Sequence, residues 1–111
     1  MSEHNKRQYQ LMLDRLTAFE AGQIPLDSLV VDLEGLLNAL EGVTIPWRQT
    51  FLHDWGKLED ERAYALFKNV KILDEETSQR IRPAVSNLKL LVLEKIDDPA
   101  DRIRNSDDTK N

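Results

Sequence analysis

The chain has 111 residues, of which 41% are hydrophobic and 32% are charged, and its formal net charge at pH 7 is −5. This length supports one hydrophobic core, and the absence of cysteine excludes disulfides, thiol nucleophiles and thiolate metal sites. The acidic balance disfavours nucleic acid as a direct ligand, because phosphate binding needs clustered Lys and Arg, and it favours a basic partner.

The first two predicted helices span about residues 3–21 and 27–42. In the first, Tyr9 and Leu16 lie on the apolar side and Gly22 provides the stop. The second carries Leu or Val at i, i+3, i+4 and i+7 positions. This spacing is typical of an amphipathic helix that buries a wide face.

The second predicted helix also has the clearest charge asymmetry in the chain. Between Gln23 and Val43 there are four acidic residues and no Lys or Arg. At about 100° per residue, three of these acids fall with one Asn in a narrow stripe beside the apolar face. We expect the stripe to form an acidic ridge that faces solvent. It consists of Asp27, Glu34, Asn38 and Glu41.

The third predicted helix contains both tryptophans and extends from Pro46 to a left-handed stop at Asn69. Pro46 suits the first helical position because its missing N–H costs nothing there, and Thr44 or Ile45 is the expected cap. Residues at steps of three or four form one stripe of this helix, which is predicted to be buried. The stripe contains Trp47, Phe51, Trp55, Leu58, Arg62 and Leu66.

Arg62 is the one charged residue in that stripe. An unpaired buried charge costs several kcal/mol, so its guanidinium must reach solvent or pair with a carboxylate. The expected partners are Glu20, Glu34 and Glu59.

After a connector at residues 70–73, Asp74 is expected to cap the fourth helix. Pro83 lies inside this helix, where proline lacks a donor and clashes with the preceding turn. We therefore expect the last helix to be kinked or broken near Pro83. Residues 97–111 are polar and lack periodicity, which predicts a flexible tail outside a single helical domain of residues 3–96.

Four amphipathic helices with short connections predict an all-α fold, either an antiparallel four-helix bundle or a less regular but compact helical array. No stretch approaches the roughly 18 apolar residues of a membrane-spanning helix. The N-terminus also lacks the apolar run of a signal peptide. We therefore expect a cytoplasmic protein with no membrane contact.

The sequence offers little for catalysis or metal binding. His4 and His53 have no paired ligand spacing, and neither a Gly-rich phosphate loop nor a nucleophile elbow is present. His53 with Asp54 or Asp60 is the one grouping that resembles a general base beside carboxylates. A solvated outer face is the simpler interpretation, so we expect no enzyme, no cofactor and no metal site.

Three segments resemble small all-helical bacterial immunity proteins, namely those of contact-dependent growth inhibition and related colicin-type systems. They are Phe19–Leu26 (FEAGQIPL), Leu33–Leu40 (LEGLLNAL) and Trp47–Leu66, which holds Trp47, Phe51, Trp55-Gly56-Lys57-Leu58-Glu59 and Ala63-Tyr64-Ala65-Leu66. The resemblance implies a cytoplasmic, non-catalytic protein. Such a protein binds a cognate toxin domain and blocks its active site or its contact with its target.

The resemblance also implies a basic partner, because many toxins of those systems are nucleases with basic clefts. An acidic protein surface is complementary to such a cleft. We therefore expect a monomer when free, a cognate toxin protein as partner, and no nucleic-acid ligand. The residues expected to contact the toxin are Asp27, Glu34 and Glu41, with Asp54, Glu61 and Tyr64 of the third helix as neighbours.

Two other functions remain open from the sequence. A helical adaptor or regulatory subunit would pair with another helix, and it predicts an exposed apolar groove and self-association. An enzyme that uses His53 with Asp60 or Asp54 predicts that His53→Ala abolishes an activity.

Overall fold

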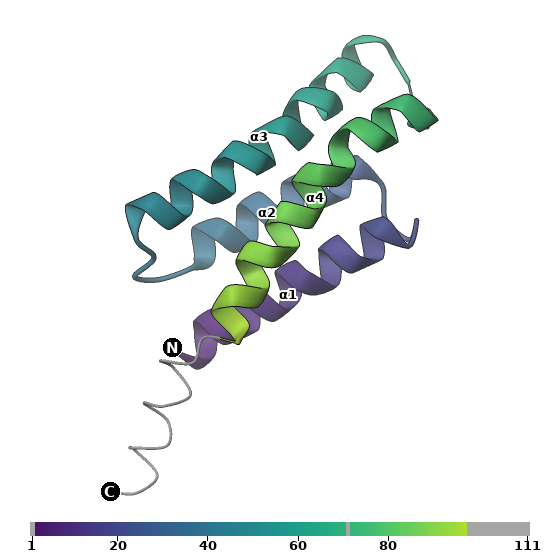
Figure 1. Ribbon diagram of the computed structural model, residues 1–111. Coiled ribbons are helices and arrows are strands. Elements are labelled where there is room, and N and C mark those ends of the chain that lie inside the picture. The colour runs from purple at the N-terminus through teal and green to yellow at the C-terminus, as the bar shows by residue number, and fades with distance from the viewer. Residues whose placement is uncertain (1, 71, 98–111) are drawn as a thin grey trace, which may run out of the picture.

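The computed structural model describes residues 2–70 and 72–97, and within them the chain folds into four α-helices (Figure 1). Consecutive helices run in opposite directions, and each packs against two neighbours in the cyclic order α1, α2, α3, α4. The fold is therefore an antiparallel four-helix bundle, which is one of the two arrangements that the sequence predicted. The helices are α1 (Glu3–Glu20), α2 (Leu26–Ala39), α3 (Ile45–Phe67) and α4 (Glu75–Ile96).

Local signals account for most of the helix ends. Ser2, Thr44 and Asp74 each accept a hydrogen bond from the backbone N–H three residues on, at 3.0, 3.3 and 2.8 Å. These bonds satisfy donors that have no partner inside the helix. Gly22 at φ +74° and Asn69 at φ +56° adopt the left-handed conformation that follows a helix end. The predictions for Thr44, Asp74, Gly22 and Asn69 are confirmed.

The hydrophobic core lies between the four helices. In α3, Phe51 and Leu58 are fully buried, whereas Trp47 and Trp55 are partly buried at the margin of the core. The ring of Tyr9 meets Trp47 edge-on, with 5.7 Å between the ring centroids. The other buried apolar residues are Met12, Leu16, Leu26, Leu29, Val30, Leu33, Leu37, Ile81, Ala84, Val85, Leu88 and Val92.

The α3–α4 hairpin extends beyond the α1–α2 hairpin at one end of the bundle (Figure 1). The helices differ in length, with 23 residues in α3 and 22 in α4 against 18 in α1 and 14 in α2. Leu66, predicted to be buried at the end of the α3 stripe, is 62% exposed. That prediction is wrong because the shorter helices do not cover the last turn of α3.

Helix α4 is one continuous helix with Pro83 inside it, so it is not broken into two. Figure 1 shows α4 bending along its length, as expected when proline removes a donor and crowds the preceding turn. Asp97 follows the last helical residue as the C-cap of α4. The rest of the predicted tail lies outside the described residues.

Candidate functional site

Helix α2 carries three carboxylates and no basic side chain. Asp27 lies in the first turn, where a negative charge complements the helix dipole. Asp32 lies 3.5 Å from the guanidinium of Arg15 in α1. Glu34 is exposed and forms no hydrogen bond or ion pair within residues 2–70 and 72–97. Part of the negative charge of α2 therefore remains open to a partner.

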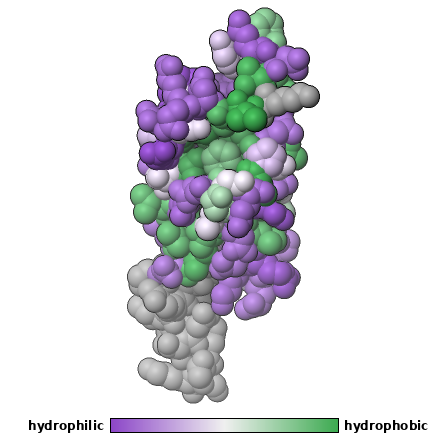
Figure 2. Space-filling model, turned by 90° about the vertical axis from the view of Figure 1, so that its right-hand side faces the viewer, coloured by the Kyte–Doolittle hydropathy of each residue, from purple (hydrophilic) through white to green (hydrophobic). Residues whose placement is uncertain are grey.

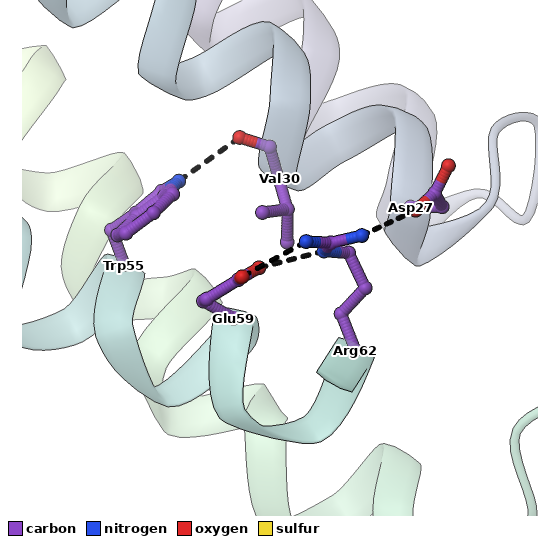
Figure 3. A network of polar contacts seen from close by, with 5 residues as sticks. All are labelled: Asp27, Val30, Trp55, Glu59 and Arg62. Atoms are coloured by element: carbon purple, nitrogen blue, oxygen red, sulfur yellow. Dashed lines mark hydrogen bonds and ion pairs between the residues drawn. The ribbon is translucent and has the colours of Figure 1, made fainter. Parts of the chain in front are cut away.

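Arg62 of α3 connects two carboxylates on different helices (Figure 3). Its Nε and Nη2 donate to the two carboxylate oxygens of Glu59 at 2.6 and 2.9 Å, and its Nη1 donates to Asp27 Oδ1 at 3.0 Å. The pairing with Glu59 was predicted, whereas the bond to Asp27 across the α2–α3 contact was not. Of the other two expected partners, Glu20 instead contacts Lys89 of α4 at 2.7 Å, and Glu34 has no ion pair within the described part of the chain.

The network around Arg62 holds a fixed negative charge. One guanidinium faces two carboxylates, so the group has a net charge of −1. The hydrogen bond from Arg62 lowers the pKa of Glu59 below its ordinary value. The hydrogen bonds to Glu59 and Asp27 raise the pKa of Arg62 above its usual range. Glu59 and Arg62 are therefore both ionised near neutral pH.

Two further hydrogen bonds hold α2 against α3. Trp55 Nε1 donates to the carbonyl oxygen of Val30 at 3.0 Å (Figure 3). At the other end of the contact, Arg48 Nη2 donates to Asn38 Oδ1 at 2.8 Å. Glu34 comes between Val30 and Asn38 along α2, and its carboxylate takes part in neither bond.

We call the surface along this contact the acidic seam. Its carboxylates are those of Asp27 and Glu34 on α2 and of Glu59 on α3. The basic groups on the seam are Arg48 and Arg62, so three carboxylates exceed two guanidinium groups by one charge. Asp60 lies about 100° further round α3 than Glu59, on the outer side of the helix beside the seam, and it is exposed without an ion pair among the described residues.

Glu41 lies outside α2, which corrects the predicted ridge. The helix ends at Ala39, three residues before the expected end at Gly42. Glu41 N–H donates to Asn5 Oδ1 at 2.9 Å, and Asn5 Nδ2 donates to Glu41 O at 2.7 Å. His4 Nε2 donates to Ala39 O at 2.6 Å. These contacts hold the chain after Ala39 against α1, so Glu41 does not continue the helical stripe.

Asp54, expected on the partner surface, is also corrected. It is only 5% exposed, and it accepts a hydrogen bond from Asn87 Nδ2 of α4 at 3.3 Å. Lys57 Nζ lies 3.8 Å from the same carboxylate. A buried carboxylate with these partners stabilises the α3–α4 contact and is not accessible to another protein.

The other two expected neighbours on α3 also lie away from the acidic seam. Glu61 accepts hydrogen bonds from Arg80 of α4, each at 3.1 Å. Tyr64 is 58% exposed, and the ammonium of Lys68 lies 5.8 Å from its ring centroid. Of the six predicted contact residues, only Asp27 and Glu34 therefore belong to the seam, and Glu59 was missed.

His53 is exposed on α3 and has no hydrogen bond or ion pair within the described residues. Its possible companion Asp54 is buried against Asn87, so these two residues do not form a catalytic pair. Across residues 2–70 and 72–97, no three His, Asp or Glu side chains converge as ligands for a metal ion.

None of the helices in the described part of the chain combines the length and the hydrophobicity needed to cross a bilayer.

Comparisons with protein-family models, with curated proteins and with solved structures returned no match to this chain. Fold and surface chemistry therefore carry the functional argument. The chain is an all-α four-helix bundle whose α2–α3 side has more carboxylates than basic groups.

The lowered pKa of Glu59 makes stability depend on pH. The ordinary pKa of this carboxyl group is 4.5, and its pKa in the folded protein is lower. The ion pair therefore stabilises the fold at pH values above the ordinary pKa. This contribution is lost as the pH falls through the folded-state pKa. Glu59→Gln should therefore lower Tm more at about pH 7 than at about pH 3.

Thermal unfolding followed by circular dichroism measures this effect. Glu94→Gln is the matched control, because Glu94 is exposed and forms no ion pair with the described residues, and its Tm should equal the wild-type value at both pH values. An equal loss of Tm in Glu59→Gln at both pH values would contradict the prediction.

Proposed function

We propose that this protein is a non-catalytic binding protein of the immunity type, which acts in the cytoplasm and neutralises a basic toxin domain through the acidic seam. The observation that carries the proposal is the excess of carboxylates on this surface. Arg62 is shared by Asp27 and Glu59, and neither Glu34 nor Asp60 beside the seam has an ion pair among the described residues.

Such a surface suits the cleft of a nuclease, which carries Lys and Arg to hold phosphates. Carboxylates along the seam can take the place of those phosphates. Complementary charge speeds the encounter of two proteins and disfavours wrong partners.

The seam is also held in place before any partner binds. Arg62 fixes the carboxylates of Glu59 and Asp27, and the hydrogen bond from Trp55 to Val30 fixes α3 against α2. Because these groups are already ordered, binding costs less side-chain entropy than it would on a mobile surface.

The proposal is tested by mixing the purified protein with a catalytically inactive form of the basic product of the adjacent open reading frame. A one-to-one complex is expected, and its association rate should fall at least roughly tenfold between about 50 and 500 mM salt, because salt screens exposed charges. An association rate that does not change with salt would contradict a role for the seam, and the lack of any complex would contradict the proposal.

A helical adaptor is the second candidate, and one observation favours it. The end of the α3–α4 hairpin exposes large apolar side chains, among them Phe67 and Ile72. An adaptor would bind another helical protein through this apolar end, whereas the immunity protein would bind a basic protein through the seam.

A further inference from the structure

The end of the α3–α4 hairpin carries a cluster of exposed apolar side chains, which we call the apolar tip. Figure 2, viewed from the side on which this connection lies, shows hydrophobic side chains gathered around that end. The tip consists of Tyr64 (58% exposed), Leu66 (62%), Phe67 (83%), Val70 (46%) and Ile72 (84%).

The apolar tip is exposed because the bundle ends before it. Arg62 contacts Asp27 in the first turn of α2, so residues 63–67 project past the start of that helix. Three of the tip side chains lie on this projecting turn of α3, and the other two lie on the chain that leads to α4.

Part of the tip is continuous across the connection between α3 and α4. A hollow of about 90 Å³ between α2 and α3 is lined by Leu66, Val70 and Leu73. A second hollow of about 60 Å³ on the α4 side is lined by Tyr64, Val70 and Leu73. Val70 and Leu73 belong to both hollows, so they join the two sides of the tip.

The size of the tip approaches that of one half of a protein–protein interface. Two of its side chains are aromatic and three are aliphatic, and their exposed fractions correspond to about 600 Å² in all. The largest apolar patch of an ordinary monomer is about 300–600 Å², and a standard interface takes about 800 Å² from each partner. The tip is therefore at the upper end of what a monomer exposes, and it could supply most of one side of a standard interface.

The charges at the tip are of both signs. The ammonium of Lys68 lies 5.7 Å from the ring centroid of Phe67, at the α3 side of the tip. Glu75 and Glu76 occupy the first turn of α4, where Glu76 lies 3.4 Å from Arg80 and Glu75 has no ion pair among the described residues. A two-fold axis through the apolar centre would bring each Lys68 toward Glu75 of the other chain.

From the area and these charges we infer that the apolar tip binds the apolar tip of a second copy of this chain, which forms a two-fold symmetric dimer. The inference departs from the monomer expected from the sequence. It does not rest on the proposed function, because it concerns the chain without its toxin.

Sedimentation velocity of the purified chain, from about 5 to 500 µM, tests the inference. The weight-average mass should rise with concentration toward twice the monomer mass. Phe67→Ser/Ile72→Ser should raise the dimer dissociation constant at least roughly tenfold, because it removes the two most exposed apolar side chains of the tip. Both side chains are on the surface, so this variant should keep the circular dichroism spectrum and Tm of the folded monomer.

The matched control is Val31→Ser/Leu90→Ser, which removes two exposed apolar side chains away from the tip and should dimerise as the wild type does. A wild-type chain that stays monomeric at every concentration would overturn the inference, and the tip would then be a surface for a different protein. Dimers that persist in the tip variant would also overturn it, since their interface would lie elsewhere.

Discussion

Phe51→Ala is expected to lower the free energy of unfolding by about 3–5 kcal/mol. Phe51 has no exposed surface, and its ring centroid lies 5.5 Å from that of Trp47. Removing the ring loses the burial of a large apolar group and leaves a cavity that a rigid bundle fills only partly. Urea unfolding followed by circular dichroism measures the change.

The matched control for this prediction is Phe67→Ala, the same substitution in the same helix, with both variants unfolded at a concentration at which the chain is monomeric. Phe67 is 83% exposed, so its loss should then change the free energy of unfolding by no more than about 0.5 kcal/mol. Similar values for the two variants would mean that Phe51 does not lie in the core.

The second large effect is expected from Glu34→Lys/Asp60→Lys, which reverses one charge on the acidic seam and one beside it. Each substitution replaces an attraction for a basic partner with a repulsion, so affinity should fall by about 10- to 100-fold, mainly through slower association. Neither carboxylate has an ion pair in the described structure, so the fold should survive. Asp27 stays unchanged, because a lysine there would face Arg62.

Asp14→Lys/Glu94→Lys controls for net charge, since it makes the same charge change on α1 and α4. Asp14 and Glu94 are exposed and form no ion pair among the described residues. This control should bind the basic partner with nearly wild-type affinity at about 150 mM salt, where distant charges are screened. Equal losses in both double variants would mean that overall charge, and not the acidic seam, governs binding.

Features that depend on residues close together in the sequence could be predicted from the sequence. The apolar periodicity, the caps at Thr44 and Asp74 and the stop at Asn69 are local signals, and they place the helices to within a few residues. The end of α2 could not be predicted in this way. It depends on contacts from His4 and Asn5, which lie 35 and 36 positions away along the chain.

The candidate site was predictable only in part, for the same reason. The pair Glu59 and Arg62 has a spacing of three that can be recognised in a helix, whereas the bond between Arg62 and Asp27 spans 35 positions. Asp54 was predicted to contact a partner, although its spacing indicated burial. It lies three residues after Phe51 and four before Leu58, so it shares their buried side of α3.

The apolar tip could not be predicted because it depends on the relative lengths of the helices. The α3 stripe predicted that Leu66 is buried, on the assumption that another helix lies beside it. In the structure that turn of α3 projects past the start of α2, and Leu66 is exposed. The periodicity of one helix does not indicate where its neighbours end.

The most direct test of the proposed function is the growth of cells that express the product of the adjacent open reading frame together with this protein. The proposal predicts that this product stops growth when expressed alone, that the wild-type chain restores growth, and that Glu34→Lys/Asp60→Lys does not, although it accumulates to the same level. Failure of the wild-type chain to restore growth would contradict the immunity function. Equal protection by the double variant would contradict the role of the acidic seam.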